Sequence, residues 1–384
     1  MTGSGAADME RHGPARRAVT ALFAVNGVAV GTFLARIPVL KTELALSEGV
    51  LGAILLGPPL GTIVAILAAG SVLATLGTRR TSHTGIAIAA IALVAVGLAD
   101  GPVALFAALT FLGAGLGAMD LAMNARGSDA EQRAGTSLMV GFHGAWSVGA
   151  LVGGGVASLS IAAGVTTATH LVAIAVLFTM AAAVATSASD TLGRGGTEPG
   201  GPRLALPRGV LVPLAAGAMA ATLAEGAVGD WAGVFVAEHR GASAAVAAAA
   251  FVAFSAAMAT SRLVGDRIVR RVGARRVAQA AGALATAGFL AAVGSPDEVT
   301  AIVAFGIVGL GVGPLFPLLL ADAGRRRGGH GIAAVSAVGY TGLVLGPPLI
   351  GFSAEATSLP TSLLGVSIVA AVIVVVARRL PTGP

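Results

Sequence analysis

Hydrophobic residues fill successive windows of about 20 residues along the chain, and the short gaps between them hold most of the charge. A predominantly apolar segment of roughly 20 residues is long enough to cross the hydrocarbon core of a bilayer as a helix. The pattern therefore predicts twelve membrane-spanning helices and no soluble domain. Their limits are 18–40, 48–74, 83–99, 102–126, 135–160, 165–187, 208–235, 243–265, 275–293, 298–322, 330–354 and 359–377.

The basic residues test this count independently. If the number of spans is even and both termini are cytoplasmic, every second gap lies in the cytoplasm, where positive charge accumulates. Of the 24 basic residues, only Arg36, Lys41 and Arg240 then fall on the outer side. This distribution supports twelve spans and predicts a multi-pass protein of the plasma (inner) membrane, with the lipid bilayer as its surroundings and both termini cytoplasmic.

Composition narrows the function classes. The chain is 55% hydrophobic and 11% charged, and its net charge of +6 comes from arginines spread over the predicted inner gaps, so it does not indicate a nucleic-acid partner. The single lysine, Lys41, does not follow a glycine-rich run, which excludes a P-loop and ATP. The absence of Cys and the scattered His residues predict no metal, no cofactor and no enzyme activity.

One gap is longer than the others and divides the chain. Residues 188–207 are polar and rich in Gly and Pro, as expected of a linker. We expect a cytoplasmic tail (1–17), a six-helix bundle (18–187), this cytoplasmic linker, a second six-helix bundle (208–380) and a short tail (381–384). Similar residues recur in both halves at a nearly constant shift: 77–80 match 273–276, 115–117 match 309–311, and Gly149 and Gly153 match Gly342 and Gly346. The two bundles are therefore expected to be pseudo-symmetric.

Two like-oriented six-helix halves joined by a cytoplasmic linker are the plan of the major facilitator superfamily, and the chain resembles it throughout. The segment after the eighth span resembles the superfamily's cytoplasmic gate motif through Asp266, Arg267, Gly273, Arg275 and Arg276. The first copy, after the second span, keeps Gly70, Gly77, Arg79 and Arg80. It departs from the motif because Ala74 and Thr75 occupy the usual acidic and basic positions.

Within the superfamily, Asp120 and Asn124 of the fourth span resemble the acidic-x-x-x-Asn element of the fucose:proton symporter family. Residues 35–38 and 141–144 resemble bacterial relatives of that family. The sugar symporter also carries an aspartate near the position of Leu34, which this chain lacks. The resemblance therefore does not extend to fucose or to any other sugar.

Ionisable residues inside spans are candidates for proton coupling, because a charge at the bilayer centre costs about 2.5–3.5 kcal/mol on insertion scales and needs a reason. Asp120, with Asn124 one turn away, and His143 at a comparable depth in the fifth span are expected to line one side of a cavity. Glu225 lies near the middle of the seventh span, where the first half has Asn26. The alternatives are hydrogen bonds between helices for Asn124 and His143, and a protonated structural side chain for Glu225.

Further residues are candidates for the substrate path, and each has an alternative. Arg36 and Asp230 lie towards the outer ends of the first and seventh spans, where Arg36 could instead reach lipid headgroups and Trp231 could be an interfacial anchor. Arg126 is expected at the inner gate or on the path. The complete set of path candidates is Asn26, Arg36, Asn124, Arg126, Trp146, Asp230 and Tyr340. The rings of Trp146 and Tyr340 could equally well pack between helices.

Duplicated spans, acids within them and no ATP site predict a secondary transporter, most simply a monomer, that moves a small molecule together with protons by alternating access. Drug antiporters of the superfamily carry a Gly-x-x-x-Gly-Pro element in the fifth span, whereas residues 149–154 have no Pro. This difference favours uptake. Efflux by a proton-coupled antiporter is the alternative, and a membrane sensor that does not transport is the alternative of a different class.

Overall fold

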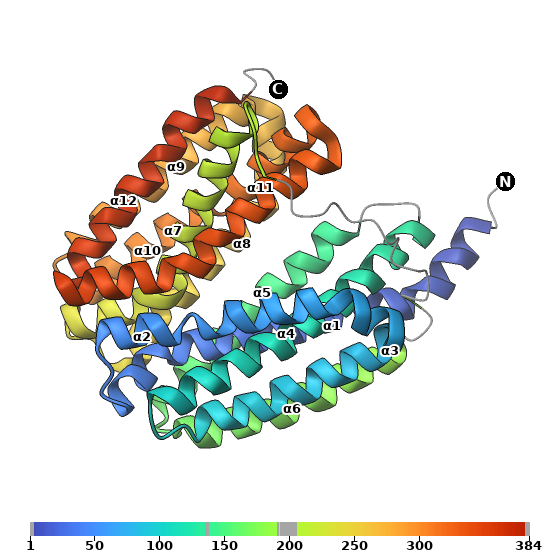
Figure 1. Ribbon diagram of the computed structural model, residues 1–384, viewed down its shortest axis with the longest axis horizontal. Coiled ribbons are helices and arrows are strands. Elements are labelled where there is room, and N and C mark those ends of the chain that lie inside the picture. The colour runs from blue at the N-terminus through green and yellow to red at the C-terminus, as the bar shows by residue number, and fades with distance from the viewer. Residues whose placement is uncertain (1–3, 135–137, 190–191, 193–205, 381–384) are drawn as a thin grey trace. The chain divides into compact units, whose positions relative to one another are not determined.

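The computed structural model describes residues 4–134, 138–189, 192 and 206–380, without the side chains of 4–13, 69–74, 140 and 266. Within this part of the chain every regular element is a helix (Figure 1). The helices are α1 (Ser4–Glu43), α2 (Glu48–Ile54), α3 (Gly57–Gly97), α4 (Pro102–Ala134), α5 (Met139–Ala162), α6 (Thr167–Ala188), α7 (Leu211–Arg240), α8 (Ala244–Val272), α9 (Ala274–Val293), α10 (Glu298–Val312), α11 (Leu315–Ala356), α12 (Leu359–Val376) and the short η1 (Ala377–Arg379).

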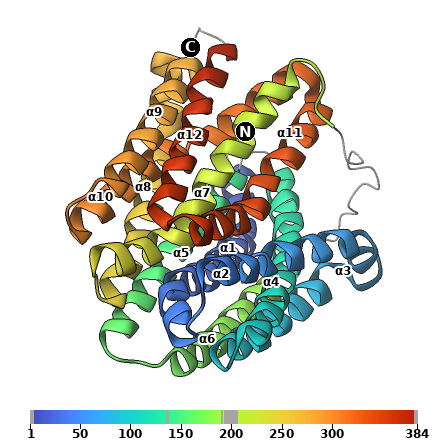
Figure 2. The same cartoon turned by 60° about the vertical axis from the view of Figure 1, so that its left-hand side comes forward.

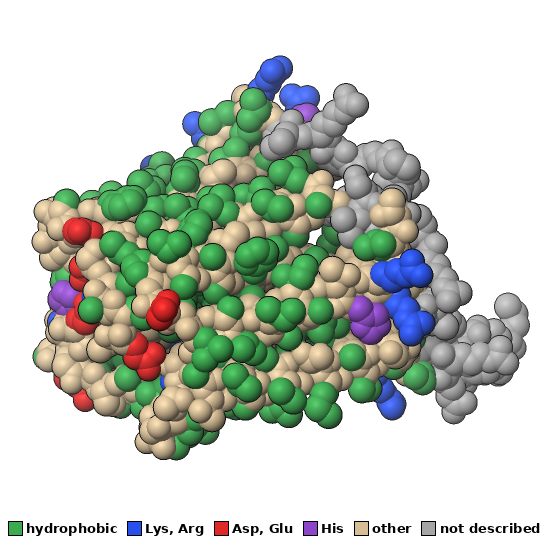
Figure 3. Space-filling view, turned by 60° about the horizontal axis from the view of Figure 1, so that its bottom comes forward, with side chains coloured by type: hydrophobic (Ala, Val, Ile, Leu, Met, Phe, Trp, Pro, Cys, Tyr) green, Lys and Arg blue, Asp and Glu red, His purple; other side chains and the backbone are tan. Residues whose placement is uncertain are grey.

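The helices confirm the predicted membrane spans. Eleven described stretches are long and apolar enough to cross a membrane. One of them, Glu298–Ala356, changes direction at Arg327 and Gly328, so it contains both spans predicted at 298–322 and 330–354. Helix α3 changes direction at Gly77, which separates the second and third predicted spans. Hydrophobic side chains are spread over much of the face shown in Figure 3, and many large apolar side chains are exposed, as expected of helices that face lipid.

Two spans are interrupted where the sequence places Gly next to Pro. The second span consists of α2 and the start of α3, with a break before Gly57. The tenth span consists of α10 and the start of α11, with a break at Gly313 and Pro314. Proline removes an amide donor and clashes with the preceding turn, which explains both breaks. The pair at positions 347 and 348 behaves differently, because these prolines remain inside α11.

Contacts within the chain divide it into two compact units. The first comprises Met1–Phe33 and Gly57–Pro199, and the second comprises Leu34–Leu56 and Gly200–Pro384. In the first unit α3 packs on α4 and α6. In the second unit α7 packs on α11, and α9 lies beside α10 and α12 (Figures 1 and 2). The end of the first span and the start of the second therefore pack with α7–α12.

Close glycine contacts within the first unit recur at corresponding positions within the second unit, which supports a duplicated architecture. A Cβ atom on Gly115 of α4 would lie 2.4 Å from the amide nitrogen of Ala89 in α3. In the second unit a Cβ on Gly311 of α10 would lie 2.5 Å from the amide nitrogen of Ala285 in α9, at the shift that relates Gly77 to Gly273. Gly115 therefore corresponds to Gly311, so the predicted match of 115–117 with 309–311 is wrong by two residues. The same shift relates two further contacts, Gly113 with Pro58 and Gly309 with Phe254.

Backbone conformation requires glycine at two positions of the gate motif. Gly77 has a φ of +70° and Gly273 has a φ of +86°, and the same shift relates the two positions. With ψ of 168° at Gly77 and 149° at Gly273, both lie in a region that is essentially restricted to glycine and costs other residues about 1–3 kcal/mol. No atom lies within 4 Å of a Cβ built on Gly77, so conformation rather than space requires glycine there. Each of these residues lets the chain turn sharply after a span.

Helices α1 and α5 approach through glycines on both partners. A Cβ on Gly31 of α1 would overlap the carbonyl oxygen of Ala150, and a Cβ on Gly153 of α5 would overlap that of Val28. Apolar side chains gain little from leaving lipid, so such close backbone contacts supply much of the helix association. In the second unit Gly342 of α11 makes the equivalent contact with Met219 of α7.

Several helices begin with a side-chain cap after short gaps predicted to lie outside. The hydroxyl or carboxylate of each cap accepts a hydrogen bond from the backbone amide three residues later, which satisfies an orphan donor. In one of them Asp297 accepts from Thr300 at 2.8 Å, and this backbone hydrogen bond lowers the pKa of Asp297. The capping residues are Ser47, Thr166, Ser243, Asp297 and Ser358.

Charged side chains join the start of the second span to α7 and α11 within the second unit. The Nζ atom of Lys41, at the end of α1, contacts Glu238 of α7 at 2.5 Å and Glu48 of α2 at 3.5 Å. Glu355 of α11 accepts hydrogen bonds from the backbone amide of Gly49 at 2.8 Å and from the hydroxyl of Ser47 at 3.1 Å. We call Lys41, Ser47, Glu48, Glu238 and Glu355 the polar clamp.

Arg240, the third basic residue predicted on the outer side, forms hydrogen bonds at the C-terminal end of α9. Its Nη2 donates to the carbonyl of Val293 at 2.6 Å, and its Nε donates to Ser295 at 2.8 Å. The guanidinium carbon also lies 4.6 Å from the centre of the Phe235 ring. Arg240 therefore satisfies carbonyls at the end of α9 that have no partner within that helix.

We predict that Gly153→Leu destabilises the protein by about 1–3 kcal/mol, the usual range for overpacking, because the new side chain meets the α1 backbone. Gly155→Leu on the same helix is the matched control, since no atom lies within 4 Å of a Cβ there. Thermal unfolding of the detergent-purified variants measures the difference. Equal midpoints for the two variants would show that the α1–α5 contact does not limit stability.

We predict that Lys41→Met loosens the polar clamp, because two carboxylates lose their shared cation. The chain contains no Cys, so Leu46→Cys, at a position that is 5% exposed, gives a single reporter thiol. In detergent, the Lys41→Met background should raise its maleimide labelling rate about tenfold, which corresponds to about 1.4 kcal/mol. Lys41→Arg is the control that keeps the charge. An unchanged rate in Lys41→Met would contradict a role of Lys41 in closing this end.

Candidate functional site

In the first unit, Asn26 connects three helices. Its Nδ2 donates to the carbonyl of Leu116 in α4 at 3.3 Å, and its Oδ1 accepts from Nε1 of Trp146 in α5 at 2.9 Å. The side chain of Asn26 is buried at a relative exposure of 3%. The structure thus brings together two predicted path residues, and Asn26 holds the Trp146 ring in place.

Asp120, Asn124 and His143 occupy α4 and α5 of the same unit. Asp120 is exposed, and the Nδ2 of Asn124 donates to the main-chain oxygen of Asp120 at 2.8 Å. The exposed ring of His143 packs edge-on against Phe23 of α1 at a centroid distance of 5.1 Å. The amide of Asn124 therefore bonds within its own helix, whereas the carboxylate of Asp120 and the imidazole of His143 are accessible to solutes.

Arg126 is fully buried near the end of the fourth predicted span. Its Nη1 donates to the hydroxyl of Ser82 in α3 at 2.6 Å, which ties α4 to the segment that follows Gly77. The buried guanidinium therefore holds two helices of this unit together.

In the second unit the structure pairs Glu225 with a residue that the sequence analysis counted only among the inner positive charges. The Nη2 of Arg262 in α8 lies 3.4 Å from Oε2 of Glu225 in α7. The Nε of Arg262 donates to the carbonyl of Gly313 at 3.1 Å. The side chains of Arg262 and Glu225 keep relative exposures of 31% and 26%. The helical stretch Ala244–Gly265, which is apolar enough to span, contains this arginine.

Proline explains why Arg262 finds an acceptor at that position. In an uninterrupted helix the carbonyl of Gly313 would accept from the amide of residue 317. Residue 317 is proline and has no amide hydrogen. The free carbonyl accepts from Arg262 instead, so the break between α10 and α11 creates an anchor for the guanidinium. The sequence shows Pro317 and Arg262, but the hydrogen bond from Arg262 to the carbonyl of Gly313 depends on how α8 and α10 pack.

Two of the alternatives given above are wrong for the ends of the first and seventh spans that are predicted to lie outside. Trp231 is 0% exposed and Arg36 is 1% exposed, so Trp231 is not an interfacial anchor and Arg36 does not reach lipid headgroups. Both lie in a unit where Pro38 of α1 packs against Gly233 of α7, which covers this region. Asp230 is half-buried, and its carboxylate has no hydrogen bond or ion pair within the described residues.

Tyr340 lies on α11 close to the α7 contact. The hydroxyl of Thr222 in α7 donates to the carbonyl of Gly339 at 2.6 Å, and the neighbouring Tyr340 is 55% exposed. The Tyr340 ring lies 5.4 Å from the ring of Phe316, in a tilted arrangement. The exposed Tyr340 ring offers an accessible aromatic surface on α11. Thr222, which bonds to the neighbouring Gly339, lies about one helical turn from Glu225 along α7.

The residues of the gate motif are arranged at the turns after the second and eighth spans. Arg79, Arg80, Arg267 and Arg276 are exposed and Arg275 is half-buried. Gly70 and the side chain of Asp266 lie outside the described side chains. The structure adds a cluster that the sequence analysis missed, in which buried Asp322 pairs with Arg325 at 3.1 Å and with Arg326 at 2.6 Å. Its signal was an acid three and four residues before basic residues on one helix.

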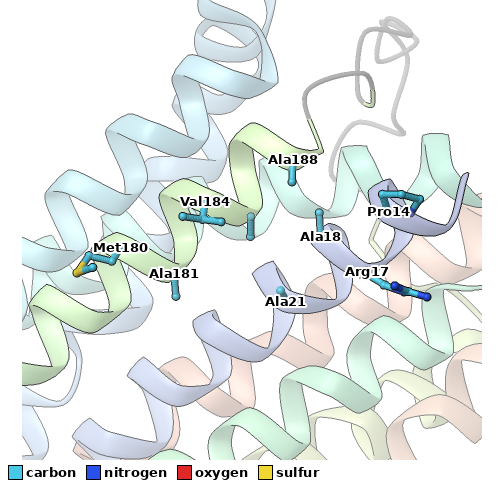
Figure 4. Close-up of a pocket in the computed structure, with 9 residues that line it drawn as sticks. Pro14, Arg17, Ala18, Ala21, Met180, Ala181, Val184 and Ala188 are labelled. Carbon is cyan, nitrogen blue, oxygen red and sulfur yellow. The ribbon is translucent and has the colours of Figure 1, made fainter. Parts of the chain in front are cut away.

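A cavity of about 550 Å³ lies between the start of α1 and the end of α6, and its lining is mostly apolar (Figure 4). Arg17, Ala18 and Ala21 contribute from α1, and Met180 and Val184 contribute from α6. None of the predicted path or proton-coupling residues lines it, so this cavity is separate from the candidate site. Among the described residues, no group of three His, Cys, Asp or Glu side chains is placed to hold a metal ion.

The fold has close structural relatives at low sequence identity. The crystal structure of a bacterial homolog to the human lysosomal transporter Spinster, inward-facing and unoccupied, matches with a TM-score of 0.71 and 15% identity, covering 96% of this chain and 97% of that chain. The nucleoside transporter NupG, as its D323A mutant, matches with a TM-score of 0.72 and 14% identity over 95% of this chain and 98% of that chain. At these identities the likeness establishes the fold alone.

Sequence comparisons identify relatives over nearly the whole chain. An uncharacterized MFS-type transporter of Yersinia pestis is 31% identical over 88% of this chain and 88% of its own length. The membrane protein MosC of Rhizobium meliloti is 28% identical over 90% of this chain and 85% of its own. The family model of the Major Facilitator Superfamily matches residues 19–327 and, overlapping them, 214–384. The chain is therefore a multi-pass membrane transporter rather than an enzyme, and it belongs to the Major Facilitator Superfamily.

Proposed function

We propose that this transporter takes up a small solute together with protons across the plasma membrane by alternating access. The observation that carries the proposal is the ion pair between Glu225 and Arg262 within spans α7 and α8. Coupling to protons requires a group whose charge changes during the cycle, and Glu225 can provide it.

The pair suits this task because its two members respond differently to protons. Arginine remains charged at any physiological pH, whereas a carboxylate can take up a proton. Protonation of Glu225 changes the net charge of the pair from zero to +1 and removes the attraction that holds Arg262. With about a quarter of its side chain exposed, Glu225 remains accessible to protons.

Asp120 is the corresponding candidate in the first unit. Its carboxylate is exposed on α4, and its helix carries Asn124 one turn further and buried Arg126 beyond it. A cycle with one protonatable carboxylate in each half would bind a proton and a solute on one side and release both on the other. We assign Asp120 to proton coupling, with His143 as the remaining titratable candidate of this unit.

The moving bodies are proposed to be the two six-helix halves, residues 18–187 and 208–380, joined by the cytoplasmic linker 188–207. The transporter is proposed to act as a monomer with both termini in the cytoplasm. Alternating access requires close helix contacts that open and close as units, and the glycine-lined α1–α5 and α7–α11 pairs can move as rigid blocks.

Uptake is preferred over efflux because residues 149–154 of α5 have no proline, unlike the span-5 element of drug antiporters. Gly149 and Gly153 instead pack directly on the α1 backbone. Deletion of the protein followed by drug-susceptibility measurements separates the two directions. A clear gain in drug sensitivity would favour proton-coupled efflux instead.

We predict that Asp120→Asn abolishes accumulation driven by a proton gradient in proteoliposomes but leaves solute exchange at equal concentrations measurable. Exchange does not require proton release, whereas net uphill movement does. Asp100→Asn, at an exposed position between spans, is the matched control and should behave as wild type. Wild-type accumulation by Asp120→Asn would remove Asp120 from coupling and leave Glu225 or His143. Loss of both accumulation and exchange would assign Asp120 to solute binding.

A further inference from the structure

We infer that Arg262 is a binding site for an anionic group, most simply a carboxylate, on the transported solute, and that one proton on Glu225 accompanies each anion bound. The inference rests on the proposed function and adds to it the chemical class of the solute. Four features of the second unit carry it.

The first feature is that Arg262 is held in position independently of Glu225. Its Nε donates to the carbonyl of Gly313 at 3.1 Å, an oxygen left without a helical partner by Pro317. The hydrogen bond therefore survives when Glu225 becomes neutral. A guanidinium anchored at one nitrogen retains the two Nη groups as a fork, which is the geometry that matches a carboxylate.

The second feature is that the fork has unused donor capacity. Nη2 faces Glu225 at 3.4 Å, which is a long contact for a charged pair, and within the described part of the chain Nη1 has no hydrogen-bond partner. The side chain is 31% exposed, so a solute can reach it. An arginine that only stabilised the fold of a membrane span would be expected to satisfy these donors.

The third feature is charge balance. The pair is neutral, and adding an anion next to ionised Glu225 places two negative groups on one arginine. Protonation of Glu225 restores balance, because the anion then takes the place of the carboxylate and the site is again neutral. At this site one proton and one monovalent anion therefore bind together without changing the net charge of the pair.

The fourth feature is that, among the described ionisable groups, only Glu225 is placed to balance the charge of Arg262. Asp230, five residues further along α7, has no contact with Arg262, and α12 has no ionisable residue. The other charged side chains that the structure describes on α7 and on the helices packed against it are engaged elsewhere or lie on other turns. They include Glu238 with Lys41, Asp322 with Arg325 and Arg326, Glu355 with Gly49, Glu298 in the first turn of α10, the exposed Arg327 and His330 of α11, and the exposed Arg267, Arg270 and Arg271 at the end of α8.

Binding to the purified full chain tests the site directly. The probes are lactate, gluconate and benzoate, each compared with a neutral counterpart: lactamide, glucose and benzamide. Thermal stabilisation is measured at pH 5.5 and pH 8, and proton uptake on binding is followed with an indicator dye in weakly buffered solution. We expect at least one anion to bind about tenfold more tightly at the lower pH than at the higher, with proton uptake, while its neutral counterpart does not bind.

The variants separate an anion site from a structural role. Glu225→Gln should bind the same anion at both pH values without taking up a proton, a gain at pH 8 that structural damage cannot produce. Arg262→Gln should lose at least about tenfold in affinity, as expected for a charge-assisted hydrogen bond, and Arg262→Lys should fall between it and wild type. Glu298→Gln and Arg270→Gln are matched controls for the charge changes and should match wild type.

Transport by the protein reconstituted in proteoliposomes is the second test. Wild type should accumulate the anion with a proton gradient, whereas Glu225→Gln should move one proton fewer for each anion that it carries. Proton-coupled accumulation of a neutral probe with no anion binding would overturn the anion site and leave the symport proposal intact. Anion binding with proton uptake but no accumulation would support the site and contradict symport. Failure of every anion to stabilise the folded wild type at either pH would overturn the site.

Discussion

Backbone polar groups that lie within a bilayer need partners inside the protein, and this requirement connects the main features of the second unit. Pro317 removes the amide that the carbonyl of Gly313 would use, and Arg262 supplies the replacement. An arginine recruited for that purpose brings a full charge into a membrane span. Its charge in turn has to be balanced, and Glu225 on the neighbouring helix balances it. A break in one helix thus accounts for an ion pair between two others.

Packing in an apolar solvent explains the large number of glycines. Burial from lipid gives side chains little gain in free energy, so association depends on close backbone contacts and a few hydrogen bonds between helices. Gly31 and Gly153 provide such contacts between α1 and α5, and Asn26 adds the hydrogen bond to Trp146. In the second unit Gly342 and the bond from Thr222 to Gly339 join α7 and α11 in a similar way. The two units use the same physical solution at related positions.

The sequence was sufficient for features that depend on local chemistry. Apolar windows located the spans, and the glycines of the gate motif proved to be required by positive φ at Gly77 and Gly273. Features that depend on tertiary contacts could not be predicted from the sequence. Arg262 stands three residues before the end of an apolar stretch, where an arginine that sets topology would also stand, and only the packing of α8 on α7 and α10 distinguishes the two. Trp231 and Arg36 are buried for the same reason, because segment Leu34–Leu56 packs with α7 and α11.

The same contacts suggest how occupancy of a site can be transmitted to the helices. Arg262 bonds simultaneously to α7 through Glu225 and to the α10–α11 break through Gly313. A change in the charge of Glu225 alters the first bond and leaves the second, so it changes how firmly α7 is tied to the point where the tenth span is weakest. A helix already interrupted by proline needs little energy to bend at that point. In the proposed cycle, protonation of Glu225 therefore biases the position of a whole span, because the Arg262 side chain links this carboxylate to the break at Gly313.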